Sequence, residues 1–201
     1  MKVQPFRLDE SPGWERVEER RIFEHPYIGL EQVTYRTPHR LEPVTWVVAR
    51  RKPGVIVAPQ LRDGRFLLIR QVRYPIQRVL WEFPAGQIDD LRFREVPDVI
   101  PQAARREMEE ETAHRVGSDG DLRFLGHFFS SQGFTDEHSY LFLATNVEPT
   151  GEGLQLDPDE GILENRPFTL EEIRRGIAMG QIVDANTLVM FAKLCACGLV
   201  E

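Results

Sequence analysis

The sequence of 201 residues has few cysteines, no long apolar run and no excess of basic residues. Its two cysteines, Cys195 and Cys197, are too few for a disulfide framework, and within "LVMFAKLCACG" we expect them to be buried in an apolar helix. No segment approaches the roughly 18 apolar residues of a membrane-spanning helix. The stretch "MKVQPFRLDESPGW" lacks the apolar centre of a signal peptide. These absences favour a cytoplasmic protein with no membrane partner.

The charge balance narrows the possible ligands. A formal net charge of -7 argues against a protein that coats nucleic acid, because phosphate backbones are bound by basic faces. It leaves room for a small phosphorylated substrate, since an acidic site can bind phosphate through a bridging metal ion. The composition, 41% hydrophobic and 28% charged, is ordinary for a globular chain, and its length suits one core with a small appendage.

The first part of the chain, residues 1–50, is rich in strand-forming residues. "RVEERRIFEH" and "LEQVTYRT" place β-branched and aromatic residues among charges, and they are separated by His25-Pro26. We therefore expect a small antiparallel N-terminal sheet in this region.

From residue 51 to residue 201, strand and helix patterns are mixed. "GVIVAPQ" and "RFLLIRQV" flank an Asp63-Gly64 turn, which is a hairpin signal, and "VLWEFPAG", "RFLGHFF" and "SYLFLATNV" are typical of further strands. Helices are expected in "PQAARREMEEETAH", in "LEEIRRGIAM" and between Asp184 and Gly198. This mixture predicts an α/β (α+β) fold with a mixed β-sheet sandwiched between helices.

An acidic cluster in "ARREMEEETAH" is the strongest chemical signal. Glu107, Glu110 and Glu111 have the i, i+3, i+4 spacing that shares one helix face, whereas Glu109 points elsewhere. An isolated acidic run is usually a solvated surface. Here, however, "WEFPAGQID" precedes it, a strand that ends in a glycine-containing turn and exposes backbone carbonyls. Carboxylates and carbonyls together favour a site for a hard divalent cation such as Mg²⁺.

The stretch from Gly86 to His114 resembles the Nudix box, G-x5-E-x7-R-E-U-x-E-E-x-G-U with U aliphatic. "REMEEE", residues 106–111, fits the R-E-U-x-E-E core without a gap. The spacing before this core is longer by six residues, "RFREVP", so that Asp98 takes the place of the first Glu. Ala113 and His114 replace the second Gly and the last aliphatic residue. If the insertion is only a polar loop, its deletion should leave the activity intact.

Further segments resemble one branch of this family. "WEFPAGQID" is similar to the E-x-P-A-G segment of ADP-ribose and nucleoside-diphosphate-sugar pyrophosphatases, and "LLIRQVRYP", "SSQGFTDE" and "GQIVDANTL" extend the similarity to nearly the whole chain. The resemblance implies the Nudix fold. It also implies a homodimer in which the N-terminal sheet is exchanged between subunits and helps to form the substrate site.

The resemblance further implies a metal site for Mg²⁺, with Mn²⁺ as a possible substitute. The implied ligands are the Ala85 carbonyl and the side chains of Glu107, Glu110, Glu111 and Glu160. The implied catalytic residues are Glu160, Glu110 and Arg106, with Glu160 of "DPDEGIL" as a ligand or general base and Asp159 as its rival. Arg106 stands next to the first carboxylate, where it could hold one carboxylate in place.

A second implied group contacts the substrate. Arg73 corresponds to an arginine that reaches the diphosphate, Trp46 to a residue that stacks on the base, and Tyr27 to a second stacking face. The remaining members are Arg51, Gln87, Ser131, Gly133 and Glu137. From the residues alone, Arg73 as a surface arginine, Trp46 as a core residue and Tyr27 as a packing residue stay open.

The implied reaction is metal-dependent hydrolysis of the diphosphate bond of ADP-ribose, giving AMP and ribose 5-phosphate. GDP-mannose or another nucleotide sugar is the nearest alternative substrate. The alternative from another class is a Nudix-fold module that binds nucleotides without cleaving them. The complete set of helix carboxylates argues against that module.

Overall fold

The computed structural model of the chain describes residues 3–7, 11–156 and 161–200. The N-terminal sheet consists of β1 (Glu15–His25), β2 (Ile28–Arg36) and β3 (Val44–Arg50). The remaining strands are β4 (Gly54–Leu61), β5 (Phe66–Arg73), β6 (Arg78–Glu82), β7 (Ala85–Gln87), β8 (His114–Val116), β9 (Leu122–Phe129), β10 (His138–Pro149) and β11 (Ile162–Phe168). The helices are α1 (Val99–Thr112), α2 (Leu170–Ala178) and α3 (Ala185–Ala196), with 3₁₀ turns η2 (Tyr74–Ile76) and η3 (Leu91–Arg94).

A mixed sheet forms the centre of the molecule. Its main path runs β11-β5-β4-β10-β8, with β6 paired to β5, β7 to β4 and β9 to β10. Strands β4 and β10 are parallel, with Leu141 opposite Ile56, whereas the other pairs are antiparallel. The predicted turn at Asp63-Gly64 joins β4 to β5, and Gly64 has φ +87°, which suits glycine. The mixed sheet between helices is confirmed.

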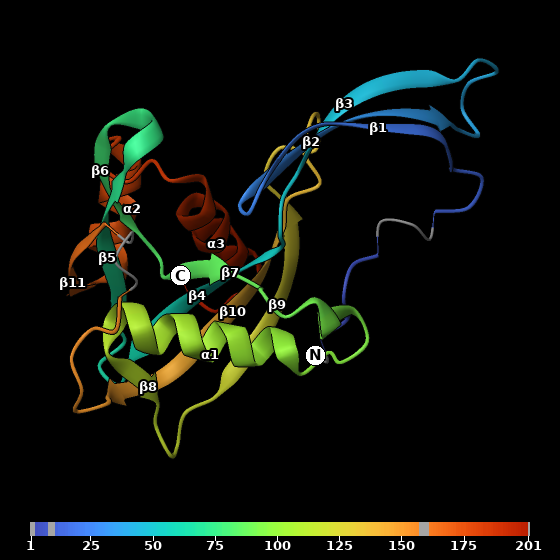
Figure 1. The fold of residues 1–201 in the computed structure, drawn as a ribbon. Coiled ribbons are helices and arrows are strands. Elements are labelled where there is room, and N and C mark those ends of the chain that lie inside the picture. Colours follow the sequence, from blue (N-terminus) through green and yellow to red (C-terminus); the bar gives the residue numbers. More distant parts are fainter. Residues whose placement is uncertain (1–2, 8–10, 157–160, 201) are drawn as a thin grey trace.

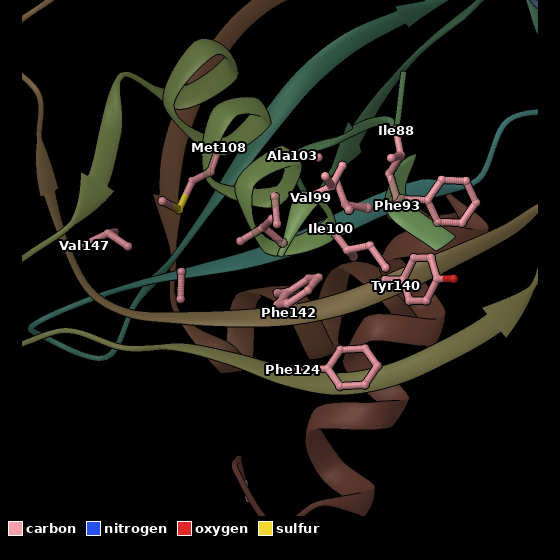
Figure 2. Packing of buried hydrophobic residues seen from close by; sticks show 14 of the residues in the cluster. Ile88, Phe93, Val99, Ile100, Ala103, Met108, Phe124, Tyr140, Phe142 and Val147 are labelled. Atoms are coloured by element: carbon pink, nitrogen blue, oxygen red, sulfur yellow. The ribbon is translucent and has the colours of Figure 1, made fainter. Parts of the chain in front are cut away.

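The two faces of this sheet carry separate cores. Val55 and Val57 of β4 point toward α1, while the alternate residues Ile56 and Ala58 point toward α2 and α3. Strand β10 repeats the pattern, and Figure 2 shows Tyr140 and Phe142 on the side of α1, where they meet Ile100 and Met108. Because side chains alternate along a strand, two central strands can line both cores. Helix α1 is thereby held against the sheet edge that carries β7.

The N-terminal sheet extends away from this body (Figure 1). Strand β1 is exposed along its whole length, and the sheet leaves apolar side chains half in solvent, among them Ile22, Phe23, Trp46 and Val47. One attachment to the body is at Ala49, whose backbone N–H donates to the carbonyl of Phe134, 2.8 Å away. The predicted antiparallel sheet is confirmed.

The interpretation of the insertion as a polar loop was wrong in one respect. Residues 91–94 form η3, whose first turn is capped by the carboxylate of Asp90, which accepts a hydrogen bond from the Arg92 N–H. Phe93 turns inward and is only 2% exposed in the core beneath α1 (Figure 2). A single aromatic residue in a polar segment can anchor it, because burying one phenyl ring is worth about 1.5–3 kcal/mol. The insertion is therefore anchored to the core through Phe93, while its other residues, 92 and 94–97, are exposed.

The expectation that Cys195 and Cys197 are buried was also wrong, since both are exposed. The buried residues of α3 are Thr187, Met190 and Leu194, which follow each other at helical spacing. Cys195 lies outside that row and Cys197 caps the helix after its last turn, so neither reaches the core. In the described parts of the chain, no helix is both long and apolar enough to span a membrane.

Candidate active site

Two carboxylates are buried where α1 contacts β7. Glu107 and Glu111 are 4% and 1% exposed, one helical turn apart on the face that meets β7. The backbone N–H of Ala85 donates to Oε2 of Glu111 over 2.9 Å. Buried charges need such partners, because an unsatisfied carboxylate loses its hydration without compensation. The other two acids lie differently, with Glu109 exposed and Glu110 at the rim.

Gly86 leaves the space in which the carboxylate of Glu107 lies. A Cβ built on this residue would stand 1.9 Å from Cδ of Glu107 and 2.2 Å from both its oxygens. No side chain can occupy that position without displacing the carboxylate. The first position of the Nudix-like pattern therefore requires glycine, because α1 approaches β7 closely there.

Arg106 holds the outer side of the cluster. Its guanidinium donates to Glu107 and, over 2.7 Å, to Oε2 of Glu110, while Nη2 also approaches the carbonyl of Gln87 at 3.4 Å. Burial alone would lower the pKa of Arg106, but the charges of Glu107 and Glu110 raise it above its ordinary value. One arginine thus keeps two of the acidic residues in fixed positions.

The donor set fits a hard divalent cation. Carboxylate oxygens of Glu107 and Glu111 and the backbone carbonyl of Ala85 are the oxygen ligands that Mg²⁺ and Mn²⁺ prefer. Across the described residues, no three His, Cys, Asp or Glu side chains are grouped closely enough to hold an ion unaided. A cation at this site would take the remainder of its ligands from backbone, substrate and water, which is the usual pattern for Mg²⁺.

Arg73 lies at the end of β5 in a bidentate pair with Glu82. Its Nε donates to Oε1 of Glu82 over 2.8 Å, and Nη2 donates to the second oxygen. The pKa of Glu82 is raised above its ordinary value, mainly by burial and further by the charge of nearby Asp184. The pairing with Arg73 lowers this pKa but does not cancel the increase. Burial alone would lower the pKa of Arg73, but Glu82, Asp184 and Glu111 raise it. Arg73 is therefore held near the carboxylate site and is not a free surface arginine.

The start of α3 fixes the turn between β6 and β7. Thr187 Oγ1 accepts from the Phe83 N–H over 2.9 Å and donates to Oδ2 of the capping Asp184 over 2.8 Å. This turn leads to Ala85, so a helix one hundred residues further along the chain positions the proposed carbonyl ligand. The sequence predicted Asp184 as the cap of this helix, which is confirmed, but it assigned no site role to Glu82 or Thr187.

The loop between β9 and β10 meets the N-terminal sheet. Trp46 donates from Nε1 to the carbonyl of Gly133 over 2.8 Å, and Nε of Arg51 lies 2.7 Å from Oε1 of Glu137. Ser131 contributes its backbone carbonyl to the loop's own turn, accepting from Phe134. Four of the predicted substrate residues are thus joined in pairs.

The aromatic candidates are both accessible. Trp46 is 52% exposed and Tyr27 is 59% exposed, which excludes a core position for either ring in this chain. Trp46 lines a cavity of about 970 Å³ with Trp14 and Tyr35, whereas Tyr27 lines a separate hollow of about 370 Å³ with Arg51. Within one chain the two rings therefore do not enclose a single base.

The predictions for Glu160 and Asp159 lie outside the described residues. The described residues before and after this gap form hydrogen bonds with residues of the site or their neighbours. The Gln155 N–H donates to the Glu110 carbonyl over 3.0 Å, and the Gly161 carbonyl accepts from Val72, the neighbour of Arg73, over 2.7 Å.

Gly86→Ala is expected to lower kcat/KM by about a hundredfold, the scale on which a displacement of roughly 1 Å acts in an active site. The added methyl group displaces the Glu107 carboxylate. Gly153→Ala is the matched control, because nothing lies within 4 Å of a Cβ at Gly153 and its φ is not positive. Equal kcat/KM for both variants in the same assay would contradict the assigned role of Gly86.

A mixed sheet between helices, with two buried carboxylates facing a glycine-containing strand, defines an α/β protein whose oxygen donors suit a divalent cation. The family model described as NUDIX domain matches residues 50–188, and the chain belongs to this family. The Nudix resemblance is thus confirmed. Ala113, at the second glycine of the pattern, ends α1 with φ +54°, a left-handed conformation that glycine adopts more readily.

Similar proteins support the same assignment. The ADP-ribose pyrophosphatase of Bacillus subtilis (strain 168) is 31% identical over 138 residues, which is 68% of this chain and 69% of the relative. The methanol dehydrogenase activator of Bacillus methanolicus is 29% identical over 140 residues, or 69% and 70% of the two chains. A crystal structure of an ADP compounds hydrolase shares the fold, with TM-score 0.70, 18% identity and coverage of 94% of this chain and 97% of that chain.

Proposed function

We propose that the protein hydrolyses the diphosphate bond of ADP-ribose or a related nucleoside diphosphate sugar, giving a nucleoside monophosphate and a sugar phosphate. The observation that carries this proposal is the pair Glu107 and Glu111, buried against Ala85 and Gly86 where oxygen donors for a divalent cation meet. The relatives named ADP-ribose pyrophosphatase support this choice of substrate.

A divalent cation, Mg²⁺ or Mn²⁺, would supply Lewis acidity and lower the pKa of a water molecule. Glu107, Glu111 and the Ala85 carbonyl would hold it, with Glu110 as a supporting ligand. Arg106 keeps Glu107 and Glu110 oriented. The proton of the attacking water passes to a carboxylate, for which we propose Glu160 or Glu110.

Arg73 is proposed to bind the diphosphate. Its pKa is raised, so it stays charged, and its side chain is 37% exposed although Glu82 fixes one edge of the fork. A guanidinium anchored on one side can present its remaining N–H groups to a phosphate with little loss of side-chain entropy.

The nucleotide end of the substrate is assigned to residues near the N-terminal sheet. Trp46 and Tyr27 are proposed to stack on the base, and the other proposed contacts are Arg51, Gln87, Ser131, Gly133 and Glu137. Because the two rings line separate hollows of one chain, a base between them requires two subunits. We therefore propose a homodimer in which residues 1–50 are exchanged, supported by the exposed apolar side chains of this sheet.

One assay tests the function. Purified protein is incubated with ADP-ribose and Mg²⁺, and AMP is measured with and without a chelator of divalent cations. AMP formed only without the chelator supports the proposal. Tight binding of ADP-ribose with no AMP would instead identify a nucleotide-binding module. A parallel panel with GDP-mannose, other nucleotide sugars, NADH and FAD fixes the substrate class.

Trp46→Ala is expected to raise KM far more than it lowers kcat, by a factor that corresponds to about 1–3 kcal/mol of base stacking. Stacking on a remote base is shared by ground state and transition state, so it acts on KM. Trp46→Phe is the control, because it keeps an aromatic ring for stacking, although a smaller one, and removes the hydrogen bond to Gly133. An equal rise in KM for both variants would assign the effect to the loop contact and not to stacking.

A further inference from the structure

The hollow beside Tyr27 is basic although the chain as a whole is acidic. Four cationic side chains line its volume of about 370 Å³, namely Arg50, Arg51, Lys52 and Arg94, and no acidic residue is among its lining residues. The net charge of the chain is -7, so this concentration of positive charge is a local feature. A cation-lined hollow beside an aromatic ring suits an anionic ligand with a planar group.

Three of these cations are tied to carboxylates outside the hollow. Arg51 pairs with Glu137 at 2.7 Å and Lys52 with Asp89 at 2.6 Å. Arg50 is bound by Glu31 at 2.6 Å and by Asp136 at 3.1 Å, and their hydrogen bonds raise the pKa of Arg50 although burial alone would lower it.

Arg94 supplies the exposed donor group at the hollow, whereas the unpartnered donor of Arg50, which lines this hollow and the cavity beside Trp46, is buried. Nη2 of Arg50 is buried and has no hydrogen-bond partner among the described residues. Arg94 is exposed, and in the described part of the chain it forms no ion pair within 4.0 Å. Its guanidinium stands 5.5 Å from the centre of the Phe93 ring. A guanidinium offers a planar fork of donors that matches the oxygens of a phosphate group.

Arg94 reaches this position because of the six-residue insertion. Phe93 anchors the segment in the core, so the next residue is held at the protein surface. The backbone carbonyl of Arg94 accepts a hydrogen bond from Arg7 at 3.1 Å, which fixes the segment from the other side. Leu91, which directly precedes the insertion, also lines the hollow. Through Phe93 and Arg94 the insertion lines the hollow together with Tyr27, which lies on the turn between β1 and β2.

We propose that this hollow binds a phosphate monoester on the nucleoside part of the ligand, with Arg94 as its principal cation and Tyr27 beside the base. The inference rests on the proposed function, in which Tyr27 contacts the nucleotide base. The insertion is then a specificity element that favours nucleotides with an additional phosphate on the ribose over those without it. Hydrogen bonds between charged groups are strong enough to give a preference of about tenfold or more.

Calorimetry with the full-length protein tests this directly. The probes are AMP and adenosine 2′,5′-bisphosphate, which differ by one phosphate group. The wild type is expected to bind the bisphosphate about tenfold more tightly, and Arg94→Ala should abolish this preference while leaving AMP affinity unchanged. Arg94→Lys should retain part of it. Arg92→Ala is the matched control, since Arg92 lies in the same insertion but pairs with Asp90 and does not line the hollow.

Three outcomes would overturn the inference. These are equal affinities of the wild type for the two probes, an unchanged preference in Arg94→Ala, and an equal loss of preference in Arg92→Ala. The inference would also be overturned if inorganic phosphate, at a concentration similar to that of the bisphosphate, removed the difference in affinity between the two probes. The site would then recognise free phosphate. A thermal melt verifies that each variant is folded. Binding is measured without turnover, so a failure of ADP-ribose hydrolysis leaves this test intact.

Discussion

Glu111→Gln is expected to reduce kcat/KM by at least about a hundredfold, or roughly 2.7 kcal/mol in activation free energy. The substitution keeps the shape of the side chain and an oxygen that can accept from the Ala85 N–H. It removes the negative charge that a divalent cation would need at this buried position. The fold should be preserved, and the melting temperature without metal should hold or rise, because one of two buried like charges is removed.

Two measurements separate this effect from general damage. Glu109→Gln is the matched control on the same helix, since Glu109 is exposed and faces away from β7. Added Mg²⁺ should raise the melting temperature of the wild type and of Glu109→Gln, but much less that of Glu111→Gln, because a ligand stabilises only the state that binds it. Activity above about a tenth of wild type, a loss below roughly 1.4 kcal/mol, would exclude Glu111 as an essential ligand.

Phe93→Ala is expected to lower the free energy of unfolding by about 3–5 kcal/mol, the usual effect of removing a buried aromatic ring. Phe93 packs in the core with Ile88, Ile100 and Tyr140. The same reasoning predicts that deleting residues 92–97 destabilises the protein, in contrast to the deletion of a simple loop. Urea unfolding at equilibrium measures both effects.

Leu91→Ala provides the comparison within the same 3₁₀ turn, directly before the insertion. Leu91 is 74% exposed, so its truncation should change the free energy of unfolding by no more than about 0.5 kcal/mol. If the urea midpoint of Phe93→Ala matched that of Leu91→Ala, the insertion would be the polar loop that its composition suggests. Phe93 would then not hold the insertion in place, and the proposed positioning of Arg94 at the basic hollow would no longer be supported.

Local patterns were sufficient for the secondary structure near the site. The acidic spacing in "REMEEE" placed Glu107 and Glu111 on one helix face, and the structure buries both on that face. The segments "GVIVAPQ" and "SYLFLATNV" were predicted as strands, and in the structure the residues of β4 and β10 alternate between two cores. These predictions succeed because helix and strand periods are properties of the chain itself.

Such patterns do not predict contacts between residues that are far apart in the sequence. The pairing of Arg73 with Glu82, the support of Phe83 by Thr187 and the hydrogen bond from Trp46 to Gly133 each join different elements. Composition made "RFREVP" look like a loop without core contacts, whereas Phe93 is buried, and it made "LCAC" look like a buried helix end, whereas both cysteines are exposed. In each case the outcome depended on which side of the segment faced the sheet.

The sequence by itself determined the elements, the family pattern and the helix face that carries the carboxylates. Only the tertiary structure decided that Gly86 makes room for Glu107, that Phe93 enters the core and that Arg94 and Tyr27 line one basic hollow. The physical reason is that periodicity follows from backbone geometry, which each segment carries with it. Burial and charge pairing depend instead on neighbours from distant segments, and these are set only when the elements pack.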